Sequence, residues 1–171
     1  MQFLGAQEVI ERKVGSKLRH LCVATIGLGL LAPAGPGWGQ QLDVPTAIAA
    51  RKDAYREMGA AFKNLNDELR KPKPIPFLVK LNAATIGKTA QRIPNWFPAG
   101  SGPSSGIKTA AKPEIWTKRG EFDAIQGKLV ADAAALDKLV AAGDMKAVAA
   151  QARVVGGDCK ACHDKFRVPE D

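Results

Sequence analysis

The fold is decided by residues 145–166, MKAVAAQARVVGGDCKACHDKF. Apolar side chains recur there at alternating steps of three and four residues, the spacing that puts them on one face of an α-helix. The members of this seam are Met145, Val148, Ala152, Val155, Cys159, Cys162 and Phe166. Asp144 can cap the start of this helix, and Pro169 ends it. A helix of this kind has to bury its seam against other helices.

A segment over residues 43–71 has the same period. Pro45 suits its first helical turn, and a Lys-Pro-Lys-Pro run beginning at Lys71 ends it. Its stripe consists of Val44, Ile48, Tyr55, Met58, Phe62, Leu65 and Leu69. Arg51 fills the one gap in this stripe, so we expect a charged side chain on the buried face.

Two further helical segments lie over residues 76–93, the weaker of the two, and 113–143. The side chains expected to face inward are Leu78, Leu81, Ala84 or Thr85, and Ala90 in the first, and Phe122, Ile125, Leu129, Leu136 and Leu139 in the second. The Pro-, Gly- and Ser-rich stretch between them, 94–112, is either flexible or covers the edge of a site. Four such segments, with a two-residue joint at Gly143 and Asp144, predict an all-α, antiparallel four-helix bundle.

The beginning of the chain has the layout of a secretory signal peptide. Four basic residues precede an apolar run from Leu21 to Ala32, and small residues follow up to Ala34. The run is shorter than the about 20 residues that a membrane helix needs. We therefore predict a signal peptide over residues 1–34, with cleavage as late as residue 39 as the alternative. The exported bundle then covers residues 40–171 and has no membrane contact.

Removing this leader reduces the number of cysteines and histidines that the mature chain can use. The whole chain has 171 residues and a net charge of +8, and the leader takes away four basic and two acidic residues. Cys22 and His20 leave with it, so Cys159, Cys162 and His163 are the only cysteines and histidine of the mature protein. Sites that need two histidines are excluded, and a structural zinc site lacks its fourth ligand. No enzymatic activity and no nucleic-acid partner are expected.

The remaining three residues form the motif Cys-x-x-Cys-His. On a helix the thiols of Cys159 and Cys162 share a face, and His163 lies beside them. Two such thiols can form thioethers with the vinyl groups of a haem while the imidazole binds the iron, and this spacing is the attachment signal of c-type haem. We therefore predict one covalent haem c near the C-terminal helix, with His163 as an axial iron ligand.

Two other roles for the cysteine pair stay open at this point. One is a disulfide or an inert pair in the core, because both cysteines lie on the seam. The other is a redox-active dithiol of the thioredoxin kind, although that motif usually follows a strand and opens a helix. Gly156 precedes Cys159 by three residues and is expected to let the backbone approach the haem; the alternative is a loose turn.

Three stretches of the chain together resemble a known family. They are GGDCKACHDKFR at 156–167, KPEIW at 112–116 and RKDAYREMG at 51–59. All three are similar to class II c-type cytochromes, the cytochrome c′ family, and the resemblance covers residues 43–168. It implies a left-handed four-helix bundle with one covalent haem near one end, export to the periplasm and, often, a homodimer.

The resemblance also says which residue faces the far side of the iron. Low-spin members of the family place a methionine four residues after the arginine of the first helix, whereas this chain has Tyr55 there. Some cytochromes c′ similarly carry a bulky residue at that position, which implies five-coordinate, high-spin iron. A phenol is protonated near neutral pH and is therefore a weak ligand. Met58, almost one turn further on, is the competing sixth ligand.

Other haem contacts follow from the same resemblance. Arg51 matches the family arginine that meets a haem propionate; the alternative is that it reaches solvent at the end of the bundle. Thr109 lies in the loop that reaches the propionates, and Phe166 is expected against the haem. Arg167 resembles the arginine beside the proximal histidine, with a plain surface role as an equal alternative. Trp116 and Phe122 either wall the haem or belong to the core.

These residues predict a periplasmic monohaem cytochrome that transfers electrons. Its five-coordinate iron is expected to bind nitric oxide or carbon monoxide. The alternatives are a low-spin electron carrier that uses Met58, and a dedicated nitric-oxide scavenger without an electron-transfer role. The expected partners are periplasmic redox proteins, towards which the basic surface could steer the protein, and a second copy of the chain.

Overall fold

The computed structural model describes residues 43–169. The predicted signal peptide and both predicted cleavage positions lie outside the described residues. The helices are α1 (Val44–Leu69), α2 (Pro76–Ala90), α3 (Glu114–Thr117), α4 (Arg119–Ala142) and α5 (Met145–Phe166), with short 3-10 turns at Ile93–Trp96 and Pro103–Ser105. Over residues 43–169, no helix combines the length and the apolar character that crossing a membrane requires.

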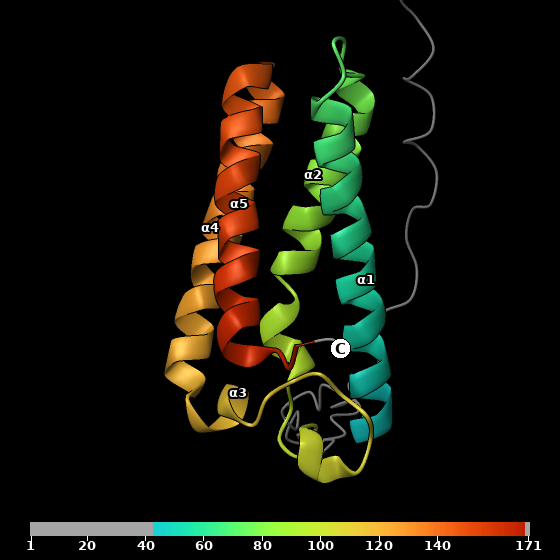
Figure 1. Cartoon of the computed structure of the whole chain (residues 1–171), viewed down its shortest axis with the longest axis vertical. Coiled ribbons are helices and arrows are strands. Elements are labelled where there is room, and N and C mark those ends of the chain that lie inside the picture. The colour runs from blue at the N-terminus through green and yellow to red at the C-terminus, as the bar shows by residue number, and fades with distance from the viewer. Residues whose placement is uncertain (1–42, 170–171) are drawn as a thin grey trace, which may run out of the picture. The chain divides into compact units, whose positions relative to one another are not determined.

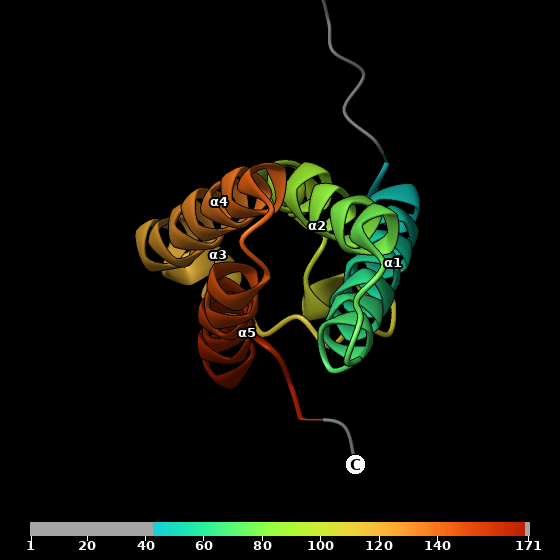
Figure 2. The same ribbon diagram turned by 90° about the horizontal axis from the view of Figure 1, so that it is seen from above.

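The four long helices run alternately up and down, as Figure 1 shows. Helix α1 packs on α2, α2 on α4, and α4 on α5, whereas α1 and α5 make few contacts with each other. Viewed from above, α1 and α5 therefore flank the open side of the bundle (Figure 2). The part of the chain that the structure describes contains no strand, so the predicted all-α, antiparallel four-helix bundle is confirmed.

The first and last helices both begin with an aspartate cap, of which Asp144 was predicted. The Asp43 carboxylate accepts a hydrogen bond from the backbone N–H of Thr46 at 2.8 Å, and Asp144 accepts one from Ala147 at 2.9 Å. Each cap satisfies an N–H group that the first helical turn leaves without a partner. At the other end of α4, Gly143 has φ of 76°, the left-handed conformation that lets the chain turn directly into α5.

A pair of glycine variants in α4 and its cap should change stability in opposite directions. Gly143→Ala is expected to destabilise the protein by about 1–2 kcal/mol, because a Cβ disfavours positive φ. Gly127 lies exposed in the middle of α4, and a Cβ there would meet nothing within 4 Å. Gly127→Ala should therefore stabilise the protein by about 0.5–1 kcal/mol. Urea unfolding of both variants measures this, and equal shifts for the two would contradict it.

The seams predicted for the first and last helices are the faces that these helices bury. In α1, Ile48, Arg51 and Leu65 are buried, and the tyrosine and the phenylalanine of the stripe are half-buried. In α5, Val148 and Val155 are fully buried. Burying an aliphatic side chain of this size contributes about 1.5–3 kcal/mol. Burial of these faces therefore stabilises the two helices that carry the candidate site.

Of the inward face predicted for α2, Ala90 is confirmed and the other positions are wrong. The buried side chains are Val79, Ala83, Ile86 and Ala90, together with Gly87 and Thr89. Leu81 is 51% exposed, and Leu78 is only half-buried. Helix α2 lies between α1 and α4, so its small residues face inward, where two neighbouring helices approach closely. Gly87 illustrates this: a Cβ there would lie 2.9 Å from the Asp137 carboxylate of α4.

The third predicted segment is divided in two. Lys118, with φ −118° and ψ 45°, separates the single turn of α3 from α4. Phe122, Leu129 and Leu136 are buried as expected, but the other two buried positions are Gln126 and Ala133, whereas Ile125 and Leu139 are only half-buried. The break allows the Trp116 indole of α3 to donate to the carbonyl of Pro98 at 3.0 Å. This hydrogen bond attaches the loop before α3 to the bundle.

Candidate functional site

A cavity of about 510 Å³ opens between α1 and α5. This size falls in the range of cofactor sites. Nine of the ten predicted site residues line it: Arg51, Tyr55, Met58, Thr109, Cys159, Cys162, His163, Phe166 and Arg167. Ile86, Phe97, Ile115 and Phe122 add apolar walls from the other elements. The fold therefore gathers residues from both ends of the chain around one space.

Cys159 and Cys162 lie in the last turns of α5 as two half-buried free thiols. Burial raises the pKa of the Cys159 thiol, and the charge of Asp158 adds to the effect. Burial also raises the pKa of the Cys162 thiol, to about 11. A redox-active dithiol needs a lowered pKa to form its thiolate. The structure therefore favours neither the disulfide nor the thioredoxin-like alternative for this pair.

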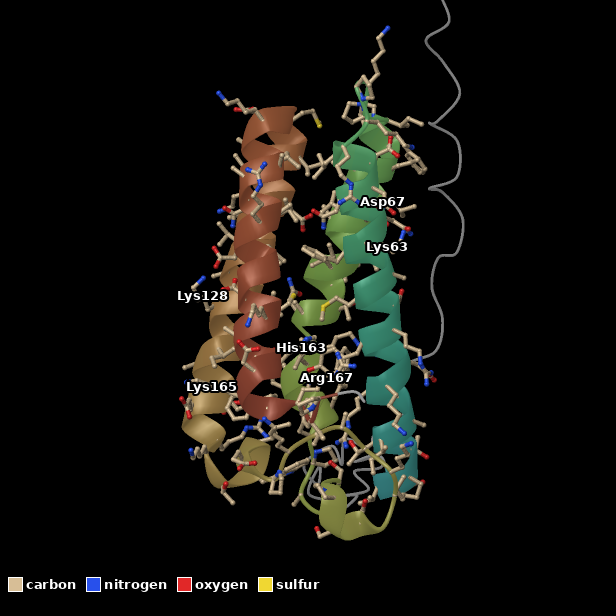
Figure 3. All side chains as sticks on the ribbon, viewed as in Figure 1. Lys63, Asp67, Lys128, His163, Lys165 and Arg167 are labelled. Atoms are coloured by element: carbon tan, nitrogen blue, oxygen red, sulfur yellow. The ribbon has the colours of Figure 1, made fainter. Side chains whose placement is uncertain are left out.

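His163 follows the second cysteine on the side of α5 that looks across to α1. Figure 3 shows it with Arg167 at the opening between these helices. The histidine is exposed, and both residues line the cavity. They also border a second hollow of about 380 Å³ with Lys112. The imidazole and the two thiols thus reach the same space from one helix end.

Tyr55 faces this space from α1. Its ring packs edge-on against Trp96 at a centroid distance of 5.3 Å and lies 6.4 Å from the ring of Phe97. Burial raises the pKa of the phenol, so the side chain is neutral at ordinary pH. Met58 lines the same cavity and is only 7% exposed. Both candidates for the far side of the iron are therefore in the space that would receive it.

Arg51 is buried, with an exposed fraction of 3%. Its Nη1 donates to Ser101 Oγ at 3.0 Å, and its Nη2 donates to the carbonyl of Ser101 and to Thr109 Oγ1, both at 2.7 Å. The guanidinium also lies 4.9 Å from the ring centroid of Phe97. The side chain therefore does not reach solvent, which was the alternative to a site role. It holds the loop between α2 and α3 against α1.

The three hydrogen bonds leave part of the guanidinium available. Arginine has five N–H donors, and the contacts to Ser101 and Thr109 use three of them. No ion pair among residues 43–169 includes Arg51. A buried arginine is best stabilised by an anion. The cavity that Arg51 lines can supply one if an acidic group binds there.

Replacing Arg51 should loosen the loop. Arg51→Leu is expected to lower the free energy of unfolding by about 3 kcal/mol, because it removes charge-assisted hydrogen bonds and leaves the buried carbonyl of Ser101 without the donor of Arg51. The next residue, Lys52, is half-exposed. Lys52→Leu should therefore change the free energy of unfolding by less than about 0.5 kcal/mol. Urea unfolding of both variants measures the difference. Similar values for the two would mean that Arg51 does not secure the loop.

The C-terminal end of α5 is joined to the same loop. Lys112 N–H donates to the carbonyl of Phe166 at 2.9 Å, and Val168 N–H donates to that of Ala110 at 2.8 Å. Ala111 and Arg167 therefore form an isolated antiparallel bridge. This bridge places Arg167 and the Thr109 end of the loop at one edge of the cavity. The Gly/Pro/Ser stretch is attached to the bundle at its two ends.

The expectation for Gly156 needs correction. This glycine does not line the cavity. A Cβ at Gly156 would lie 2.9 Å from Cζ of Phe62. The missing side chain thus accommodates the Phe62 ring of α1, which itself lines the cavity. In this structure Gly156 acts on the cavity wall through Phe62, because the helix face that carries it points towards that ring.

Three residues at or beside the cavity were not predicted. Phe97 is 5% exposed and contacts Tyr55, Trp116 and Phe122 through its ring. Its signal was an aromatic pair, Trp96 and Phe97, at the start of a stretch that is otherwise polar. Ser101 had no signal in the sequence, because its burial depends on Arg51.

Gln126 is the third unpredicted residue, and the sequence did contain a signal for it. It is the one polar residue at a regular position of the α4 stripe, as Arg51 is in α1.

Trp116 and Phe122 were predicted either to wall the haem or to belong to the core. Trp116 contacts Phe97 and does not line the cavity, whereas Phe122 does line it.

The cytochrome c′ family model matches residues 46–167 of this chain. The chain belongs to the cytochrome c′ family. A cytochrome c′ of Rhodopseudomonas palustris is 37% identical over 150 residues, which cover 86% of this chain and 96% of that protein. A cytochrome c-556 of Agrobacterium tumefaciens is 33% identical over 124 residues, covering 71% of this chain and 96% of the relative. The family resemblance seen in the sequence is therefore confirmed.

Solved structures agree with this assignment. A cytochrome c′ with an unusual ligand-controlled dimer dissociation matches the fold with a TM-score of 0.70 and 25% identity, covering 75% of this chain and 98% of that one. Members of the cytochrome c′ family carry a covalently bound haem c, and this chain carries one too. The cavity fits such a group: two thiols, an imidazole, apolar walls and a cation with spare donors face it.

Proposed function

We propose that this cytochrome c′ is a periplasmic monohaem electron-transfer protein whose iron is five-coordinate, high-spin and open to nitric oxide or carbon monoxide. The observation that carries the proposal is the neutral phenol of Tyr55, which lines the cavity from the α1 side. A neutral phenol fills space without supplying a strong ligand. Haem supplies the redox chemistry and the binding of a gas.

The residues of α5 hold the cofactor in this proposal. Cys159 and Cys162 form the two thioethers, and the imidazole of His163 is the proximal iron ligand. This assignment rests on the motif spacing and on the placement of all three side chains along one cavity. Phe166 closes the cavity near the same helix end, where it is 3% exposed and packs edge-on against Phe122 at 5.3 Å.

Charged residues at the cavity edge orient the acidic groups of the haem. Arg51 has two N–H donors left to offer a propionate, and Thr109 lies beside it. Arg167 lies at the proximal edge with His163 (Figure 3). The lining residues include Lys52 and Arg56 but no acidic side chain. A positive edge favours acidic groups on a redox partner, so raising the salt concentration should slow electron transfer to such a partner.

A low-spin electron carrier is the second candidate. Met58 favours it, since the side chain lies in the same cavity and thioether sulfur is a good iron ligand. A protein that only scavenges nitric oxide would share the open iron but would not exchange electrons with a partner. We infer that the protein carries electrons and does not act as an enzyme. Apart from Cys159, Cys162 and His163, no residue that lines the cavity belongs to a catalytic arrangement of side chains.

Absorption spectra of the matured protein, ferric and ferrous, with and without nitric oxide, test the proposal. Broad high-spin bands that change when the gas is added are the expected result. Sharp low-spin bands that do not change when the gas is added would mean that Met58 or another side chain occupies the sixth position. Reduction by a periplasmic redox protein then separates an electron carrier from a scavenger, which would bind the gas but exchange no electrons.

We also propose a homodimer. The surface of α2 carries Phe77 and Leu81 one turn apart, and they are 70% and 51% exposed. Apolar side chains grouped in this way mark contact surfaces. A related cytochrome c′ forms a dimer that dissociates under ligand control. Sedimentation of a monomer at all concentrations, with or without carbon monoxide, would rule this proposal out.

A further inference from the structure

The buried stripe of α4 contains one polar side chain, Gln126. It is 2% exposed and lies between α4 and α5. Its Nε2 donates a hydrogen bond to Sγ of Cys162 at 3.4 Å. Among the described residues, Cys159 receives no corresponding side-chain hydrogen bond. The two cysteines of the motif are therefore held differently, although they are only one turn apart.

Packing alone does not explain a glutamine at this position. The Oε1 atom of Gln126 is buried and has no hydrogen-bond partner among the described residues. Burying an amide with one end unpaired costs free energy that an aliphatic side chain of the same length would not. The neighbouring positions of the stripe, Phe122 and Leu129, are apolar. The contact with Cys162 is the polar interaction that the side chain gains in return.

The direction of this hydrogen bond suits the attached form of the cysteine. Thioether formation adds the thiol across a vinyl group: the S–H bond breaks, C–S and C–H bonds form, and no electron is exchanged. A thiol sulfur can donate or accept, whereas a thioether sulfur can only accept. The N–H of Gln126 is a donor and can therefore bond the sulfur both before and after attachment.

We propose that Gln126 is a positioning residue for haem attachment. Its amide holds Sγ of Cys162 at the wall of the cavity and stays bonded to the thioether in the mature protein. Without the donor, the sulfur of Cys162 samples other rotamers, and a larger share of the chains is attached through Cys159 alone. This role concerns attachment and is independent of the spin state of the iron or its affinity for gases.

Matched glutamine variants of the haem-loaded protein test the proposal. Gln126→Met keeps the length of the side chain and removes the donor. Gln151→Met is the control: Gln151 is half-buried on α5 and donates to the carbonyl and carboxylate of Asp132, both at 3.1 Å, away from the cavity. The unfolded holoproteins are alkylated, and mass spectrometry measures the fraction of chains that carry an alkylated Cys162.

For Gln126→Met, the ratio of singly to doubly attached chains should rise about fivefold, which corresponds to about 1 kcal/mol, the value of one hydrogen bond. Gln151→Met should leave the ratio at the wild-type value. Equal ratios in all three proteins would overturn the proposal. So would an equal rise in both variants, because any lost glutamine contact would then have the same effect.

A second measurement needs no variant and serves if Gln126→Met yields no holoprotein. In a crystal structure of the haem-loaded wild-type protein, Nε2 of Gln126 should lie within hydrogen-bonding distance of the Cys162 sulfur. An amide turned away from that sulfur would refute the proposal. Neither result depends on nitric oxide. A low-spin protein that does not bind the gas would therefore contradict the proposed function without contradicting the role of Gln126.

Discussion

Replacing Cys159 and Cys162 together by alanine should reduce covalently bound haem from one per chain to none. The cysteines line the cavity as free thiols, and the only other cysteine of the sequence, Cys22, lies in the predicted signal peptide. The cavity of about 510 Å³ would then lose its fixed occupant. Side chains around an empty space of this kind lose packing contacts. We therefore expect the double variant to be a poorly folded bundle.

Extraction with acidified acetone, followed by measurement of haem in the protein pellet, distinguishes covalent from dissociable haem. Each single variant should keep haem through one thioether. Ala161→Ser changes an exposed residue inside the motif and should keep the wild-type amount. A double variant that folds cooperatively and retains haem through extraction would disprove the assignment of these cysteines.

Tyr55→Met should convert the iron from mainly high-spin, five-coordinate to mainly low-spin, six-coordinate. The substitution puts a thioether where α1 now presents a neutral phenol to the cavity. Methionine sulfur binds haem iron well, whereas a protonated phenol does not. A shift of the spin populations by more than about tenfold would correspond to about 1.4 kcal/mol of ligation free energy. Electron paramagnetic resonance of the ferric protein measures it.

Two further substitutions on α1 make this result specific. Tyr55→Phe keeps the bulk of the ring and should stay high-spin. Met58→Leu removes the competing sulfur and should also leave the spin state unchanged. If Tyr55→Met looks like the wild type, residue 55 does not face the iron and the register assumed for α1 is mistaken. If Met58→Leu turns a low-spin protein high-spin, Met58 is the sixth ligand.

The sequence was most informative where one helix face meets one core. The seams of α1 and α5 could be predicted because each helix buries a single stripe, so the hydrophobic period and the buried face coincide. The predicted cap of α5, Asp144, is a local feature that depends on neighbouring backbone groups. The grouping of Cys159, Cys162 and His163 along one surface also follows from helix geometry alone. These features required no knowledge of the other helices.

The sequence was least informative for α2 and for the loop. Helix α2 is enclosed by two neighbours, and its inward face therefore has small residues such as Ala83 beside Val79 and Ile86, while Leu81 points outward. Hydrophobicity alone predicts that Leu81 faces inward. Ser101 is buried because Arg51 reaches it across 50 positions in the chain. No local pattern contains a pairing of that length.

By itself, the amino-acid sequence determined the first and last helices, the faces that they bury and the chemistry of the attachment motif, because these depend on residues within a few positions of one another. Only the tertiary structure decided that Arg51 secures the loop, that Gly156 accommodates Phe62, and that Gln126 supports Cys162. Each of these contacts joins different elements, so its geometry exists only after the helices have packed. The cavity is likewise a product of the packing, since it lies where α1 and α5 remain apart.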